Sequence, residues 1–284
     1  MTTLPTRTVG PDRAIVTRLG LGGEGVLRTF GRDVEAQSVI DAALDDGITY
    51  CESARAYSGS EAYYGKALGS RRKNVFLATK AHDRTKSGAR RMLEQSMQAL
   101  GTSWIDLWQF HDIREYAEVH DLEDPDGAYA AFVEAKERGD VRAIGVTGHH
   151  DPAVLRAALE RVHFDTVLLP INPAEGALPD AFERTVVPAA RARGMSIIGM
   201  KVFAHGLLFR PGAGGITPGE AMTYALSADV DVVVIGCDAP AQVNANATYA
   251  RTAAQLDADA RRRLELRAAP LARRLAYYRA GSAA

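Results

Sequence analysis

Short runs of hydrophobic residues recur along the chain, and a segment with the polar and apolar spacing of a helix follows each one. Consecutive apolar positions, as in residues 232–235, are typical of a strand that is covered on both faces of a parallel sheet. We therefore predict an alternation of strands and helices. Eight runs have this character: residues 19–22, 48–51, 75–79, 105–110, 141–146, 166–169, 196–200 and 230–235.

Helix boundaries agree with the same alternation. Asp151 stands before Pro152, which is the order expected of an N-cap residue followed by proline at the first helical position. Glycines stand where helices should end, at Gly47, Gly101, Gly139 and Gly194. The expected helices cover residues 34–45, 88–100, 125–138, 152–161 and 180–193, with a charged helix over 257–280 at the end of the chain.

Eight strand and helix units favour a closed (β/α)₈ TIM barrel of the α/β class, with residues 1–284 forming one domain. An open, doubly wound sheet would need a glycine fingerprint leading directly into the first helix, and residues 19–25 do not fit that spacing. The least helix-like inserts are 112–124 and 210–218, which we expect at the active face. Little chain follows Tyr278, so we expect an open pocket.

Composition narrows the possible partners. The formal net charge is −1 and 24% of the residues are charged, so the sequence indicates neither a nucleic-acid nor a membrane partner. The two cysteines, Cys51 and Cys237, lie in strand-like runs and do not indicate a disulfide. The first ten residues do not have the pattern of a secretory signal, and no window is long and apolar enough to span a bilayer. We expect a cytoplasmic enzyme, and the abundance of alanine and arginine is typical of a bacterial source.

Four polar residues follow the second, third and fourth strands, where the reacting groups of a barrel lie. They are Glu52, Tyr57, Lys80 and His111. A phenol titrates near pH 10, so we expect Lys80 to favour the ionised form of Tyr57, with Glu52 holding the lysine. The imidazole of His111 would orient a carbonyl group toward the phenol. Taken singly, each residue has an ordinary structural explanation.

The strings around these residues resemble the aldo-keto reductase family. Residues 48–61 with 65–68 are similar to its signature, while 75–80 and 105–111 are similar to the strands that carry its lysine and histidine. The resemblance continues through 139–147 and 194–208. It implies a reductase that uses NAD or NADP to reduce a small aldehyde or ketone, with Tyr57 as proton donor.

The same resemblance implies a set of cofactor-binding positions, and several of them depart from the family pattern. Thr147 and Gly148 replace a Ser-Asn pair, Leu168 replaces a glutamine, and Met200 replaces an aromatic ring. Glu52 stands where the family has aspartate, and we expect the longer carboxylate to work. The full set is Gly23, Thr147, Gly148, Met200, Lys201, Phe203, Gly236, Cys237, Asp238, Gln242 and Asn246.

The last strand lacks the basic residues that commonly hold the 2′-phosphate of NADP. Cys237 and Gln242 stand at those positions, and Asp238 would repel that dianion, so NADH and NADPH both remain open.

Three further histidines, His149, His150 and His205, follow later strands. We expect ligand contact or plain loop roles for them and no metal site. The polar insert 112–124 suggests a sugar-like or otherwise hydroxylated carbonyl substrate, and a secondary-metabolite carbonyl stays open as well.

Two other functions stay open. A non-redox isomerase or lyase would use the same tyrosine, lysine and histidine for proton transfer, and the altered carboxamide contacts favour it. A dinucleotide-binding accessory protein would couple the cofactor to a protein partner. The number of subunits is not predictable from the sequence.

Overall fold

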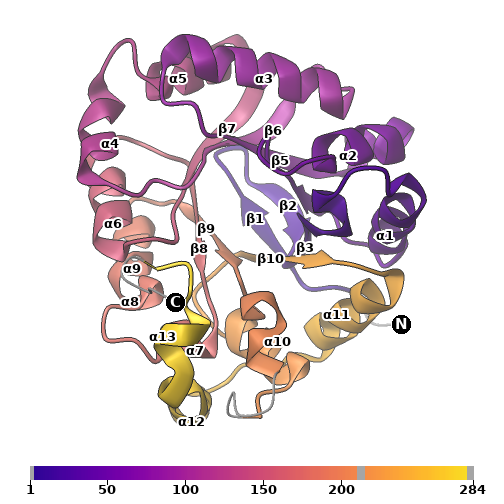
Figure 1. The fold of residues 1–284 in the computed structure, drawn as a ribbon, viewed down its shortest axis with the longest axis vertical. Coiled ribbons are helices and arrows are strands. Elements are labelled where there is room, and N and C mark those ends of the chain that lie inside the picture. The colour runs from indigo at the N-terminus through magenta and orange to yellow at the C-terminus, as the bar shows by residue number, and fades with distance from the viewer. Residues whose placement is uncertain (1–2, 210–214, 280–284) are drawn as a thin grey trace.

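The computed structural model describes residues 3–209 and 215–279. Eight parallel strands form a closed barrel in the order β10-β3-β4-β5-β6-β7-β8-β9, which confirms the predicted TIM barrel (Figure 1). Each predicted run lies in one of these strands or overlaps it. The strands are β3 (Leu19–Gly25), β4 (Tyr50–Glu52), β5 (Phe76–Ala81), β6 (Ile105–Phe110), β7 (Val141–Thr147), β8 (Thr166–Pro170), β9 (Ser196–Met200) and β10 (Val232–Cys237).

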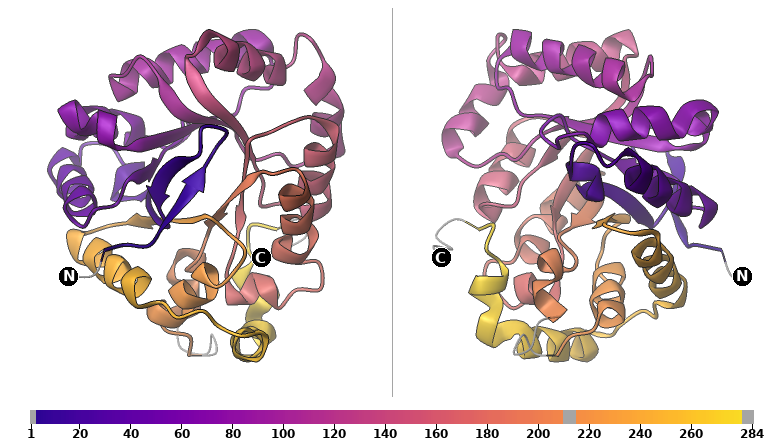
Figure 2. Two further views of the ribbon diagram at one scale, coloured as in Figure 1. Left: turned by 180° about the vertical axis from the view of Figure 1, so that it is seen from behind. Right: turned by 45° about the vertical axis from the view of Figure 1, so that its right-hand side comes forward.

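Helices surround the barrel and cover the outer faces of its strands (Figures 1 and 2). The N-cap at Asp151 is confirmed, because its side chain accepts a hydrogen bond from the Ala153 amide. Gly101 and Gly139 cap their helices in the left-handed conformation. The main helices are α1 (Asp33–Asp45), α2 (Ser60–Leu68), α3 (Lys86–Leu100), α5 (Ala128–Arg138), α6 (Pro152–Arg161), α10 (Pro218–Leu226), α11 (Pro240–Thr252) and α12 (Ala258–Ala268).

Two predictions about helices were wrong. The helix expected over 180–193 is broken at Val186 into α8 (Phe182–Thr185) and α9 (Val187–Ala192), because Pro188 lacks the amide that would continue the first helix. The helix expected over 257–280 ends as α12 just before Pro270. A 3₁₀ turn, Ala269–Leu271, and the short α13 (Ala272–Leu275) follow it. Residue 280 lies outside the described residues.

The insert after β6 contains structure that was not predicted. The helix α4 (Tyr116–His120) begins with a capping box, in which Glu115 and Glu118 satisfy each other's backbone amides. Residues 210–214 of the other expected insert lie outside the described residues, and α7 (Pro173–Gly176) is a further short helix after β8.

An antiparallel hairpin of β1 (Thr6–Val9) and β2 (Ala14–Thr17) precedes the barrel and was also missed. It lies across the end of the barrel where the strands begin (Figure 2). The Gly10 amide donates to the Ser196 hydroxyl at 3.1 Å, and Val9 and Val16 pack on the barrel interior. The hairpin closes that end, so the opposite end is the open one.

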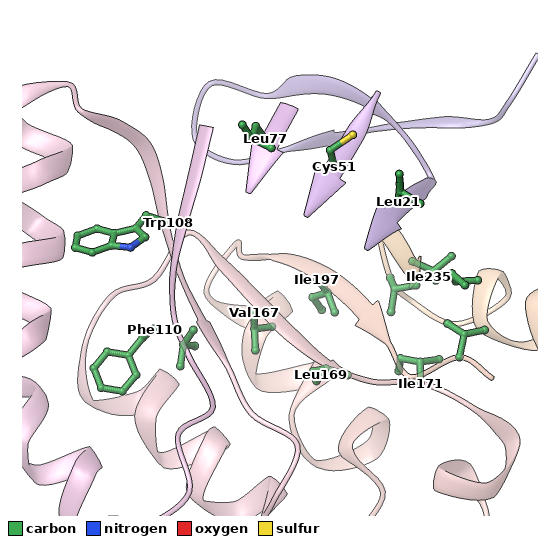
Figure 3. Packing of buried hydrophobic residues seen from close by; sticks show 14 of the residues in the cluster. Leu21, Cys51, Leu77, Trp108, Phe110, Val167, Leu169, Ile171, Ile197 and Ile235 are labelled. Carbon is green, nitrogen blue, oxygen red and sulfur yellow. The ribbon is translucent and has the colours of Figure 1, made fainter. Parts of the chain in front are cut away.

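Side chains alternate between two cores. Outward residues such as Leu77 and Trp108 pack against the helices (Figure 3). The Trp108 and Phe132 rings stack with 3.7 Å between their centroids. Inward residues such as Tyr50, Ala78 and Leu107 fill the barrel. This alternation decides which strand-end residues point into the mouth of the barrel.

Candidate active site

The two-residue period of the strands brings Glu52 and Lys80 into the barrel. Glu52 follows the inward Tyr50 by two residues, and Lys80 follows the inward Ala78 by two. Both side chains are buried, with Lys80 only 1% exposed. The loop after β4 continues to pair with β5, since the Arg55 amide donates to the Lys80 carbonyl at 3.1 Å. This pairing carries the loop across the lysine and sets the position of Tyr57.

The four predicted catalytic residues meet at the open end of the barrel. The Lys80 ammonium contacts the Glu52 carboxylate and donates to the Ser53 carbonyl at 2.9 Å. Its Nζ lies 3.4 Å from the Tyr57 Oη. The His111 ring approaches the Tyr57 ring edge-on, with 5.7 Å between centroids. A carboxylate, an amine, a phenol and an imidazole are thus in one cluster suited to proton transfer.

Burial controls the protonation of this cluster. It raises the pKa of Tyr57 above its ordinary value, and the Glu24 charge adds to the effect while Arg28 opposes it. Burial also lowers the pKa of Lys80, and the negative charge of Glu24 opposes this shift. At Tyr57 burial outweighs the opposing Arg28 charge, so the phenol is protonated at neutral pH, which suits a proton donor. That Lys80 acidifies this phenol stays a prediction.

His111 is neutral at pH 7. Its pKa lies well below 6.5 because burial disfavours the imidazolium, and the Lys80 and His149 charges act in the same direction. A neutral imidazole has one donor and one acceptor nitrogen, so it can hydrogen-bond an uncharged carbonyl without competing for the phenol's proton.

A cavity of about 480 Å³ extends from Glu52 and Tyr57 to the side of α11. Its volume is in the range of small-molecule and cofactor sites, roughly 300–1,000 Å³. Gly236 lies in its wall, where an added Cβ would come within 2.6 Å of the Glu24 Cβ, so the wall is bare backbone at this point. A cavity with a phenol in one part of its wall and amide side chains in another has polar groups that suit a dinucleotide.

The structure sorts the predicted cofactor positions into two groups. Seven of the eleven line the cavity: Met200, Lys201, Phe203, Gly236, Asp238, Gln242 and Asn246. The other four do not line it and have packing or hydrogen-bonding roles. The Thr147 hydroxyl accepts the Asp112 amide at 2.7 Å, and Gly148 packs against Leu155. Gly23 faces Ser60, while the Cys237 thiol, whose pKa burial raises to about 12, accepts from the Asn246 amide at 3.4 Å.

Several cavity residues were missed. Glu24 lies in the wall and pairs with Arg28 at 2.8 Å, and the Arg28 guanidinium lies over the Tyr57 ring at 4.9 Å. Tyr249 lines the α11 side together with Gln242 and Asn246. The spacing 242, 246, 249 on one helix face was a readable signal for Tyr249. No comparable signal existed for Arg28, which reaches the site from a 3₁₀ turn.

The last described residues, 277–279, are held against the barrel by buried polar contacts. Tyr278 is buried, and its Oη donates to Glu175 and accepts from the Asn172 amide, both at 3.2 Å. Arg279 pairs with Glu175 at 2.6 Å and anchors the segment further. These buried partners hold the last described turn in place, and the expectation of an open pocket stays a prediction.

The charges of the insert after β6 are largely paired within the protein. Asp112 pairs with Arg114 at 2.6 Å, and Glu118 pairs with Arg84 at 2.6 Å. In the described part of the chain, no three His, Cys, Asp or Glu side chains are placed to hold a metal ion. Likewise, none of the described helices is long and apolar enough to cross a membrane.

Comparison with known proteins gives consistent matches. The Aldo/keto reductase family model matches residues 18–220. Pyridoxal 4-dehydrogenase of Microbacterium luteolum is 26% identical over 254 residues, covering 73% of each chain. D-threo-aldose 1-dehydrogenase of a Pseudomonas species is 26% identical over 308 residues, covering 83% of this chain and 89% of its own. An aldo-keto reductase of Bacillus halodurans in its holo form superposes with a TM-score of 0.78 at 25% identity, covering 94% of this chain and 97% of its own.

Proposed function

From the premise that this chain belongs to the aldo/keto reductase family, we propose that it interconverts an aldehyde or ketone and its alcohol with NADH or NADPH. The observation that carries the proposal is the 3.4 Å approach of the Lys80 Nζ to the Tyr57 Oη at the end of the cavity. When bound, the reduced nicotinamide supplies the hydride.

Tyr57 is the proton donor in this proposal. Burial keeps its phenol protonated, and the Lys80 amine donates to the phenol oxygen, so the proton of that phenol is free to point at a carbonyl oxygen. His111 orients the carbonyl through a neutral imidazole, and Glu52 holds Lys80 in place.

The cavity residues suggest how the dinucleotide is held. Met200 and Phe203 offer apolar contact near the barrel mouth, while Gln242, Asn246 and the backbone at Gly236 offer polar contact near α11. The substrate is a small carbonyl compound. Two relatives are named as dehydrogenases of pyridoxal and of a D-threo-aldose, which supports a polar one.

Reduction of a generic aldehyde, 4-nitrobenzaldehyde, followed through the absorbance of NADH and NADPH, tests the proposal. Tyr57→Phe should lower kcat by about 10²–10⁴-fold while leaving cofactor binding, measured by fluorescence titration, unchanged. Tyr116→Phe is the matched control, because it removes an exposed phenol outside the cavity and should leave kcat within about twofold. If the protein bound neither NADH nor NADPH, the isomerase or lyase alternative would be favoured instead.

A further inference from the structure

Lys201 is the first residue after β9, and its side chain lines the cavity together with Tyr57 and Glu52. Its backbone has a φ of 56°, a left-handed conformation that is uncommon for lysine. The Asn172 side-chain amide holds this conformation by donating to the Lys201 carbonyl at 3.1 Å. The local structure therefore directs an ammonium group into the cavity at a conformational cost.

The Lys201 ammonium makes no hydrogen bond or ion pair within the described part of the chain. The carboxylates that act on its charge, Glu24 and Asp112, are already paired with other cations. Glu24 pairs with Arg28 at 2.8 Å, and Asp112 pairs with Arg114 at 2.6 Å. Lys201 is a surplus positive charge in the cavity wall.

The groups around the Lys201 ammonium do not supply the negative charge that a carboxylate would supply. Its Nζ lies 5.1 Å from the Tyr278 ring centre and 6.0 Å from that of Tyr277, which is a weaker attraction than an ion pair. His149 and His205 pack against these two rings, and both imidazoles have lowered pKa values, chiefly through burial and then through the Lys201 charge. A partly buried cation without a counter-ion is costly unless a ligand supplies one.

We propose that Lys201 binds an anionic oxygen group of the ligand, the carboxylate of a carbonyl substrate being the first choice. Its neighbours Tyr277, Tyr278 and His149 belong to the C-terminal segment and the loop after β7, whereas the other polar positions proposed for the dinucleotide lie on β10 and α11. A phosphate group of the cofactor is the other anionic oxygen group that can pair with Lys201. The assignment of a substrate carboxylate to Lys201 rests on the proposed function.

Two aldehydes, 4-carboxybenzaldehyde and methyl 4-formylbenzoate, have the same ring but differ in charge. They distinguish a substrate carboxylate from a cofactor phosphate as the anion that Lys201 binds. With a substrate carboxylate on Lys201, Lys201→Met raises the KM of the acid about tenfold or more and leaves the ester within about twofold. With a cofactor phosphate on Lys201, the same variant raises the Kd of NADH or NADPH about tenfold and affects both aldehydes equally. Lys201→Arg, which keeps the charge, should retain most of the wild-type behaviour.

A readout without turnover separates this inference from the proposed function. Calorimetric titration with benzoate and with inorganic phosphate should show at least one of them binding the wild type, and Lys201→Met should weaken it about tenfold. The surface variant Lys73→Met controls for net charge and should bind like the wild type. Lys201→Met should also melt at or above the wild-type temperature, because it removes an unpaired charge, whereas a purely structural lysine would lower it.

The outcomes are distinct. If the wild type reduces neither aldehyde with either cofactor, the proposed function fails, and calorimetry alone decides the role of Lys201. If Lys201→Met leaves the two KM values, the two cofactor Kd values and the anion titrations unchanged, Lys201 does not bind an anion and the inference is wrong.

Discussion

The Nζ of Lys80 lies 3.4 Å from the Oη of Tyr57, which makes the amine a donor to the phenol oxygen. Lys80 is 1% exposed and also contacts Glu52, so a buried carboxylate fixes the position of its ammonium group. The chain thus holds a protonated phenol in place through a buried ion pair, next to the cavity.

Removing the Glu52 carboxylate should lower both the stability of the fold and the rate of the reaction. Glu52→Gln leaves the Lys80 ammonium buried without its partner, so we expect the free energy of unfolding to fall by about 3–5 kcal/mol. Glu52→Asp keeps the charge and should recover most of this loss. Chemical denaturation measures both variants. A Glu52→Gln variant as stable as the wild type would show that the pair contributes little.

Acid should destabilise the fold through His149. Burial, and then Lys201, lower the pKa of this imidazole to about 4, while Asp112 opposes them. The unfolded value is about 6.5, so between these pH values the unfolded chain binds more protons than the folded chain. The free energy of unfolding therefore falls as pH decreases from about 6.5 to about 4, by roughly 3 kcal/mol from this group.

Denaturation curves of the wild type and of His149→Gln at pH 7 and pH 4.5 test this contribution. The variant should lose less stability on acidification, since it has no imidazole to protonate. His120→Gln removes an exposed histidine and should follow the wild type. Equal acid sensitivity in all three proteins would exclude His149 as a source.

Gly25 should be intolerant of a side chain. It has a φ of 70°, and an added Cβ would lie 2.5 Å from the Cys237 carbonyl oxygen on β10. We expect Gly25→Ala to cost about 2–4 kcal/mol of stability, from the left-handed backbone and the clash together. Gly31→Ala is the matched control: its φ is 71° with nothing within 4 Å, so it should cost only about 1 kcal/mol. Thermal melts that fall equally would argue against the clash.

The cavity should prefer NADH to NADPH. Asp238 lines its α11 side, where its negative charge opposes a 2′-phosphate. We expect the Kd of NADPH to exceed that of NADH by about tenfold, and Asp238→Arg to reverse the order. Asp259→Arg changes the net charge equally on the exposed face of α12 and should leave the ratio unchanged. A wild type that binds NADPH more tightly would contradict the prediction.

Sequence reasoning located the eight barrel strands and the cluster at their ends because both depend on local patterns. A buried parallel strand is apolar over its own few residues, and Glu52, Lys80 and His111 each end or directly follow such a run. The helices were less predictable where proline breaks them, as at Pro188 and Pro270, since the periodicity on either side continues.

The sequence by itself therefore determined the barrel, its strand order and the meeting of a phenol, an amine, a carboxylate and an imidazole at one end. Only the tertiary structure decided that burial outweighs the Arg28 charge at Tyr57, that Tyr278 folds back against His149, and that Lys201 has no counter-ion among the described residues. These outcomes depend on solvent exclusion and on contacts between residues more than a hundred positions apart, and a local pattern carries neither.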